Sequence, residues 1–99
     1  MLYAIVGHDA PDVLPRRQLQ RPAHLERIRR LLDGGRLLLA GPLPAIDSPD
    51  PGPAGCAGSL IVAEFPSLED ARAWVAADPY VTAGVFSNVD VHPFVKVVP

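Results

Sequence analysis

The order of strand-like and helical segments along the chain is the feature that most limits its fold. Four short apolar runs rich in strand-forming residues are predicted strands, and they span residues 2–8, 36–43, 59–65 and 87–98. One helical stretch lies between the first and second runs, and another lies between the third and fourth. This order predicts an α+β domain of the ferredoxin-like βαββαβ type, with a four-stranded antiparallel sheet and its helices on one face.

Prolines shape the prediction for the first helical stretch. Pro15 suggests a short helical turn over residues 14–20, and the main helix is expected to begin at Pro22. A proline suits the first turn because its missing N–H would have no partner there. Apolar residues then recur at helical spacing until Gly34 and Gly35 end the helix.

The second helical stretch is bounded by clearer signals. Ser67 and Asp70 resemble a capping box that begins this helix, and Pro79 ends it. A further turn over residues 79–84 leads into the last strand. Pro93 in that strand is compatible only with an edge position or a bulge.

The apolar character of the central strands predicts a partner for the sheet. Right-handed crossovers place the strands 2–8 and 59–65 at the centre, and their segments 2–6 and 60–63 are apolar on both faces. Because two short helices can cover only one face, we expect a second copy of the chain to cover the other. The expected assembly is a homodimer, which could associate further.

Length and charge exclude several classes of protein. The chain has 99 residues, which predicts one domain spanning residues 1–99. Its formal net charge of -2 argues against a broad nucleic-acid-binding face. No apolar stretch approaches the roughly 20 residues of a membrane span. No signal peptide is recognisable and the single cysteine, Cys56, cannot form an intrachain disulfide, so we expect a cytoplasmic protein.

The segment 44–58 is long for a connection between two neighbouring strands, and it is rich in Pro, Gly, Ala and Asp. Loops of this length in a small domain are usually functional or mobile. We expect residues 44–57 to be the most mobile region and to close over a pocket.

Several motifs together resemble the YciI-like (YCII-related) domain family. The most specific combination is RPAH at 21–24, GRLLLAGP at 35–42 and DPYVTAGVF at 78–86, and the similarity extends over nearly the whole chain. The resemblance implies a dimeric α/β-barrel protein whose active site contains a His and an Asp. Matched by motif, these residues are His24 of RPAH and Asp78 of DPY. Proteins of similar fold act on aromatic-derived compounds without a bound metal.

The expected position of His24 suggests its chemistry. A helix that begins at Pro22 places His24 in the first turn, where the positive end of the helix dipole disfavours the imidazolium. The ring would then be neutral and able to accept a proton near pH 7, as a general base must. The alternative is a half-buried histidine that packs or caps at the start of the helix.

Asp78 has two compatible roles. As an N-cap, its carboxylate can accept the N–H of Tyr80 or Val81. If the helices bring Asp78 close to His24, the carboxylate can also fix the tautomer of the imidazole and stabilise its charged form.

Four further residues are candidates for contact with a substrate: Arg21, Gly41, Ser59 and Tyr80. Arg21 could bind an anionic group, and Tyr80 could offer its hydroxyl. Gly41 and Ser59 are expected at strand ends, where a ligand can approach closely. Structural alternatives stay open: a solvated position for Arg21, a turn requirement for Gly41 and a core position for Tyr80.

The sequence predicts neither a metal site nor a nucleotide cofactor. The three histidines lack metal-ligand spacing, and no CxxC, GxGxxG or P-loop pattern is present. The leading hypothesis is an enzyme without a cofactor that uses His24 and Asp78 for proton transfer on a small organic molecule, by isomerisation, elimination or hydrolysis. The alternative is a non-catalytic dimeric module that binds a small molecule in the same pocket. A purely structural partner protein is a weaker third hypothesis.

Overall fold

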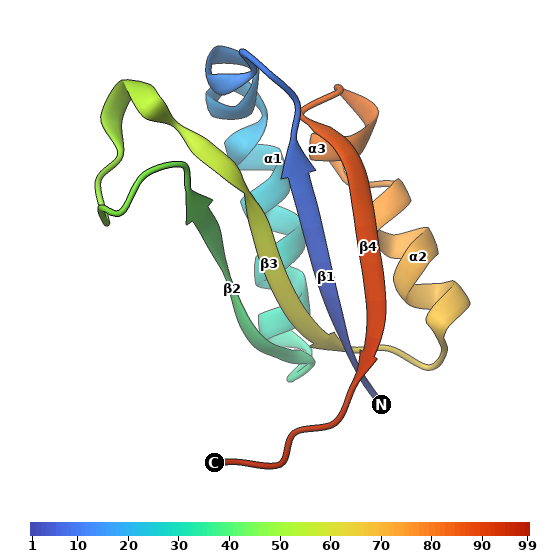
Figure 1. Ribbon diagram of the computed structural model, residues 1–99. Helices are drawn as coiled ribbons and strands as arrows, with labels where there is room; N and C mark the ends of the chain where they lie inside the picture. The colour runs from blue at the N-terminus through green and yellow to red at the C-terminus, as the bar shows by residue number, and fades with distance from the viewer.

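A single layer of four antiparallel strands forms the front of the molecule, and three helices pack behind it in the computed structural model, which describes residues 1–99 (Figure 1). In chain order the elements are β1 (Leu2–Asp9), α1 (Leu14–Asp33), β2 (Leu37–Pro44), the 3-10 turn η1 (Gly52–Ala54), β3 (Cys56–Glu64), α2 (Leu68–Ala76), α3 (Pro79–Thr82) and β4 (Phe86–Phe94). The strands lie in the order β2-β3-β1-β4. The predicted ferredoxin-like arrangement, with β1 and β3 at the centre, is confirmed. None of the helices has the length and apolar character needed to cross a bilayer.

The core lies between the sheet and the helices. Side chains alternate along β1, so that Tyr3 and Ile5 face the helices and are buried. They pack with Ile61 and Ala63 of β3 and with Ile28 of α1. This alternation fixes the register of the central strands, because a slip by one residue would turn the core side chains outward.

Two glycines allow close packing at the upper end of the central strands. A Cβ on Gly58 would lie 1.9 Å from the carbonyl oxygen of Gly7. A Cβ on Gly7 would lie 2.4 Å from the ring of Phe86. At Gly58 the obstructing atom belongs to the backbone, so β1 and β3 could not approach this closely with any other residue there.

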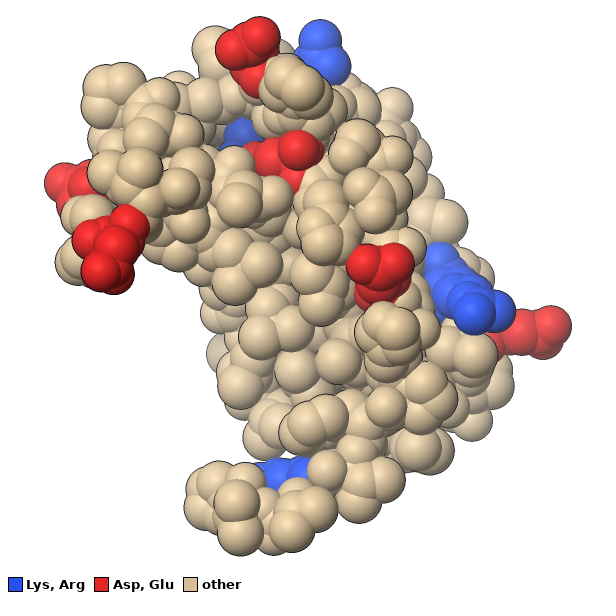
Figure 2. Space-filling view, in the orientation of Figure 1, with Lys and Arg blue, Asp and Glu red and all other residues tan.

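The opposite face of the sheet, which we call the open face, carries no helix. Figure 2 looks onto this face and shows that charged side chains are sparse over its middle. The strand register places Ala4, Val6, Leu60 and Val62 on the open face, together with Leu39, which is 46% exposed. An apolar sheet face of this kind is typical of an interaction surface.

The first helix differs from the prediction. α1 is one continuous helix, with Pro15 in its first turn and Pro22 in its interior. The prediction was wrong because it weighed the hydrogen bond that an internal proline removes but not the packing of one unbroken buried face, which includes His24 and Ile28. His24 therefore lies in the middle of the helix, and the dipole argument for a neutral imidazole does not apply to it.

Strand boundaries also differ from the prediction. β3 begins at Cys56 because its first residues still find partners in β1 and β2, so Ser59 lies within the strand rather than at its end. Gly41 likewise lies inside β2. β4 ends at Phe94, where its only neighbour β1 offers no further residues to pair with, and residues 95–99 extend away from the sheet (Figure 1).

Candidate active site

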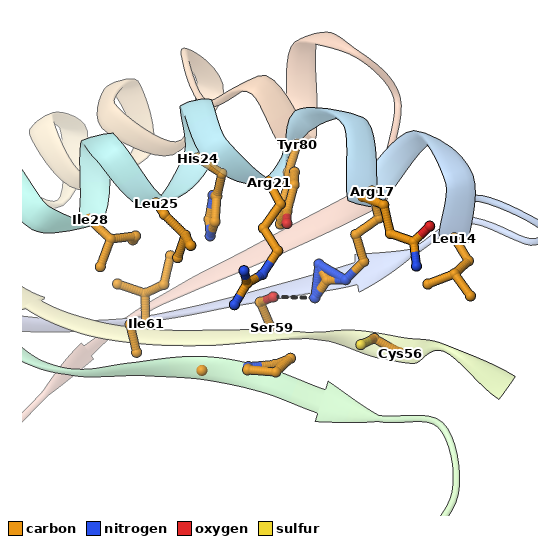
Figure 3. Close-up of a pocket in the computed structure, with 14 residues that line it drawn as sticks. Leu14, Arg17, Arg21, His24, Leu25, Ile28, Cys56, Ser59, Ile61 and Tyr80 are labelled. Carbon is orange, nitrogen blue, oxygen red and sulfur yellow. Dashed lines mark hydrogen bonds between the residues drawn. The ribbon is translucent and has the colours of Figure 1, made fainter. Parts of the chain in front are cut away.

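A pocket of about 310 Å³ lies between α1 and the half of the sheet formed by β2 and β3. Figure 3 shows side chains of α1 directed from one side into this space and side chains of the strands directed from the other. Its apolar lining consists of Leu14, Leu25, Ile28, Ala40, Pro42 and Ile61. Its other lining residues are Arg17, Gln18, Arg21, His24, Gly41, Cys56, Ser59 and Tyr80. The volume is at the small end of the range for ligand sites and suits a molecule of about one ring.

His24 and Asp78 form a direct hydrogen bond at the wall of this pocket. Nδ1 of His24 lies 2.8 Å from Oδ1 of Asp78, and the two side chains are 8% and 1% exposed. The expected contact between these groups is confirmed. Asp78 is also the N-cap of α3, since Oδ1 accepts the N–H of Tyr80 at 2.9 Å. The N-cap hydrogen bond and the contact with His24 therefore occur together at Asp78.

The partners of Asp78 indicate which nitrogen of His24 carries a proton. Oδ2 accepts a hydrogen bond from Nη1 of Arg27 at 3.0 Å, so both oxygens of the Asp78 carboxylate act as hydrogen-bond acceptors. Nδ1 of His24 must then be a donor, and Nε2 is the acceptor when the ring is neutral. Figure 3 shows the tip of the imidazole directed into the pocket. The site thus places an imidazole nitrogen toward the ligand space and a buried carboxylate behind the ring.

Arg27 is a site residue that the sequence analysis missed. Besides its bond to Asp78, Nη2 donates to the backbone carbonyl of Trp74 at 2.8 Å, and the guanidinium lies 4.4 Å from the centre of the Trp74 ring. Arg27 therefore connects α1 to the end of α2 and holds Asp78 beside His24. The available signal was its spacing, because a residue three positions after His24 lies on a neighbouring part of the same helix face.

Tyr80 packs flat against the imidazole of His24. The two rings are stacked with centroids 4.0 Å apart and an angle of 9° between their planes. Tyr80 is buried, yet Figure 3 shows its hydroxyl directed into the pocket. Burial raises the pKa of the phenol from 10.0, although the charges of Arg17 and Arg21 oppose that rise. The hydroxyl is therefore protonated at neutral pH and can donate a hydrogen bond to a ligand.

Arg17 is a second site residue absent from the prediction. Its buried guanidinium donates through Nη2 to the carbonyl of Gly58 at 2.8 Å and to Oγ of Ser59 at 2.6 Å. Because Oγ of Ser59 accepts this bond, the proton of the Ser59 hydroxyl is free to be donated to a ligand. The guanidinium also lies 4.7 Å from the centre of the Tyr80 ring.

Arg21 completes a row of polar side chains on α1. Arg17, Arg21 and His24 are three to four residues apart and line the same pocket, a pattern that appears only when the helix continues through Pro22. Arg21 is exposed, and its guanidinium extends toward the strand that carries Ser59 (Figure 3). The lining contains two arginines and no Asp or Glu, so the pocket favours a ligand with negative charge.

Gly41 borders the pocket through its backbone alone. It pairs with Leu60 on the open face, whereas Ala40 and Pro42 on either side of it pair with helix-facing residues of β3. A Cβ at Gly41 would meet no atom within 4 Å, and its φ is not positive, so neither packing nor a turn requires the glycine within this chain.

The Cys56 thiol is half-buried at the start of β3, where it also borders the pocket. The structure contains no group of three or more His, Cys, Asp or Glu side chains arranged to hold a metal ion.

Comparison with known proteins relates this arrangement to a protein family. The model of the YCII-related domain matches residues 1–95. The chain belongs to this family. Protein YciI of Escherichia coli O6:H1 is 59% identical over 97 residues, which cover 98% of this chain and 99% of that protein. An uncharacterized protein of Haemophilus influenzae is 47% identical over 97 residues, with the same coverage of both chains. The resemblance recognised from the sequence motifs is confirmed.

The YCII-related fold of this chain also occurs in an enzyme of known structure. The 5-chloro-2-hydroxyhydroquinone dehydrochlorinase TftG of Burkholderia phenoliruptrix, solved in complex with 2,5-dihydroxybenzoquinone, has a TM-score of 0.84 to this chain and 28% sequence identity. The match covers 98% of this chain and 96% of TftG. The same α+β fold therefore serves an enzyme whose substrate is a small molecule.

Proposed function

We propose that this YCII-related protein is an acid–base enzyme for small organic molecules, in which His24 transfers a proton and Asp78 supports it. The observation that carries the proposal is the buried hydrogen bond of 2.8 Å between these residues, at the wall of a pocket into which the free edge of the imidazole points (Figure 3). The proposed proton transfer uses side chains of this chain alone.

The first proposed step is transfer of a proton from the substrate to Nε2 of His24. The imidazole then becomes positively charged, and the carboxylate of Asp78 next to Nδ1 stabilises that charge. A positioned general base typically contributes about 10²–10⁴-fold to a rate. Return of the proton to a different atom of the substrate completes an isomerisation. In an elimination, the electron pair of the broken bond to hydrogen forms a double bond as the leaving group departs with its own bonding pair, and the imidazolium then gives its proton to water.

Four of the remaining polar side chains of the pocket can donate hydrogen bonds. The hydroxyls of Ser59 and Tyr80 and the guanidinium groups of Arg17 and Arg21 belong to its lining. When a proton leaves an atom next to a carbonyl group, negative charge develops on the carbonyl oxygen, and preorganised donors stabilise that charge. This set of donors supports a substrate that has several oxygen atoms and one acidic hydrogen.

The similarity to TftG supports a more specific class of substrate. TftG is named for a chlorinated hydroxyhydroquinone and was solved with a dihydroxybenzoquinone, and both compounds are flat rings that carry several oxygens. A pocket of about 310 Å³ with apolar residues on both of its walls suits a single ring of this kind. We therefore favour a small cyclic compound with hydroxyl or carbonyl oxygens as the substrate.

We also propose that the protein functions as a homodimer whose two open faces pack together. Leu39 and Leu43 on this face are 46% and 37% exposed. Burial of apolar surface stabilises association by about 25 cal/mol per Å². Face-to-face packing of the two sheets would cover these side chains and leave both pockets, which lie on the helix side, open to ligands.

Turnover of ring compounds by a His24 variant tests the proposed chemistry. The wild type would be incubated with 5-chloro-2-hydroxyhydroquinone and its unchlorinated analogues, and the change in absorbance and any released chloride would be recorded. We expect turnover, and we expect His24→Gln to lower it by at least about 10²-fold. His92→Gln removes an exposed histidine that lies outside the pocket, on the open face, and is the matched control for loss of an imidazole. It should keep the wild-type rate as long as it remains dimeric.

Two other outcomes would change the interpretation. Turnover that is the same in His24→Gln as in the wild type would reject the role of His24. Saturable binding of the ring compounds with no turnover by the wild type would favour the non-catalytic binding module.

A further inference from the structure

Asp9, the last residue of β1, carries a buried carboxyl group that the proposed reaction does not use. Its side chain is 5% exposed, and its Oδ2 lies 3.6 Å from Nε of Arg17. Asp9 is not part of the pocket lining, whereas Arg17 is. Arg17 therefore links this carboxyl group to the ligand space.

The ion pair between Asp9 and Arg17 leaves one buried polar atom of each side chain without a hydrogen-bond partner. Arg17 uses Nη2 for Gly58 and Ser59 and directs Nε toward Asp9, while its Nη1 is buried and has no hydrogen-bond partner. Oδ1 of Asp9 is also buried without a partner. Buried donors and acceptors are normally paired, so a donor and an acceptor left over in one cluster indicate that the cluster is built for a further group or a further proton.

We propose that Asp9 is a positioning residue that holds Arg17 ready for an anionic oxygen of the ligand and takes up a proton when that oxygen binds. This inference rests on the proposed function, because it concerns the charge of the ligand in the same pocket. In the empty pocket an ionised Asp9 balances the charge of Arg17. An anionic ligand competes for that charge, and protonation of Asp9 removes the repulsion between the two negative groups.

The surroundings of Asp9 support such an exchange. Burial raises the pKa of its carboxyl group from 3.8, and Arg17 opposes that rise only in part. The other ionisable groups that share this region are Tyr80 of α3, which packs under Arg17, and beyond it Arg21 and Asp78. On its other side, Asp9 lines a surface hollow with Asp12 and Cys56. Arg17 is the one cation paired with Asp9, and its charge opposes the larger effect of burial, so an anion bound to Arg17 would weaken the interaction that favours the ionised carboxyl group.

Calorimetric titration with 2,5-dihydroxybenzoquinone, whose hydroxyls are ionised at neutral pH, tests this exchange. All proteins would carry His24→Gln, so that protonation of the imidazole contributes nothing to the signal and no turnover occurs. Titrations from about pH 5 to about pH 9, in buffers of different ionisation enthalpy, give the number of protons taken up per bound ligand. We expect an uptake that approaches one proton in part of this range, and an affinity that falls as the pH rises.

A second substitution at Asp9 assigns this proton. With Asp9→Asn added, the uptake should disappear, and binding near about pH 8 should tighten by about tenfold or more, because the repelling charge is gone. Asp12→Asn removes an exposed carboxylate from the adjoining loop and is the matched control. It should leave both the uptake and the affinity unchanged.

The outcomes separate this inference from the proposed function. Absence of proton uptake over the whole pH range, or an unchanged uptake in Asp9→Asn, would overturn the role of Asp9 and leave the acid–base proposal standing. Absence of binding at millimolar concentrations would also overturn it, since the pocket would then not accept this anion. If Asp9→Asn does not fold, the protein that retains Asp9 still shows whether a proton is taken up on binding, and absence of this uptake overturns the inference.

Discussion

The guanidinium of Arg27 donates a hydrogen bond to Oδ2 of Asp78 across 3.0 Å, from the middle of one helix to the residue that begins another. This bond leaves Oδ1 of Asp78 to His24 and to the backbone of Tyr80. The orientation of the carboxylate toward the imidazole therefore depends on a side chain that does not line the pocket.

Arg27→Gln should lower kcat by about 10- to 100-fold, because a small misplacement of a catalytic group is enough for a loss of this size. KM should change little, since Arg27 does not line the pocket. Arg29→Gln, which removes an exposed arginine from the same helix, is the matched control. Steady-state kinetics on both variants gives the answer, and equal rates for the two would contradict a positioning role for Arg27.

Asp78→Asn should reduce kcat by about 10²–10⁴-fold, because the amide cannot stabilise a charged imidazole and can select the wrong tautomer. The variant should remain folded, since Asn is as good an N-cap as Asp and can still accept the N–H of Tyr80. Kinetics combined with circular dichroism separates these two effects. Asp33→Asn, at an exposed position near the end of α1, serves as the control. A variant that unfolds would instead assign Asp78 a mainly structural role.

The homodimer prediction can be tested on the open face. Leu39→Lys places a charge among the apolar side chains of this face and should convert the dimer to a monomer, as measured by light scattering coupled to size-exclusion chromatography. Leu19→Lys makes the same change at a position of α1 that is 76% exposed, and it should remain dimeric. A wild-type protein that is monomeric at micromolar concentration would disprove the dimer directly.

Most of the fold could be predicted because its signals are local. Alternation in the strands and helical spacing in α2 are visible within a few neighbouring residues, and so are the caps at Ser67 and Asp78. The interior position of Pro22 could not be read locally. The hydrogen bond that Pro22 removes from the helix can be inferred from the sequence. The burial of α1 against the sheet, which compensates for this loss, depends on residues far along the chain.

The difference between local signals and long-range contacts also explains which residues of the candidate site could be predicted. His24 and Asp78 were found through motifs that resemble those of the family, and the structure brings them into contact. Arg17 contacts Gly58, 41 residues away, and Arg27 contacts Asp78, 51 residues away. A local sequence pattern cannot predict contacts between residues so far apart in the chain. For the catalytic or substrate-binding roles of these residues, the kinetic and binding experiments above are the tests.

The last prediction concerns Asp9 in the absence of ligand. Burial raises the pKa of its carboxyl group from 3.8 in the folded protein, with Arg17 opposing the rise. A group with a raised folded-state pKa contributes stability that is fully present below its unfolded pKa and is lost as the pH rises through its folded pKa. The free energy of unfolding of the wild type, relative to that of Asp9→Asn, should therefore fall as the pH rises from about 4 and should level off above the raised pKa.

Urea unfolding of the wild type, Asp9→Asn and Asp12→Asn, followed by circular dichroism between about pH 4 and about pH 8, measures this dependence. Acidic groups other than Asp9 titrate in both the wild type and Asp9→Asn, so the difference between these two proteins isolates one carboxyl group. The difference between the wild type and Asp12→Asn should stay flat, because Asp12 is exposed. A difference at Asp9 that grows in favour of the wild type with rising pH would mean that Arg17 stabilises the ionised carboxylate more than burial destabilises it. Asp9 would then be a permanent counter-charge for Arg17 rather than a group that exchanges a proton.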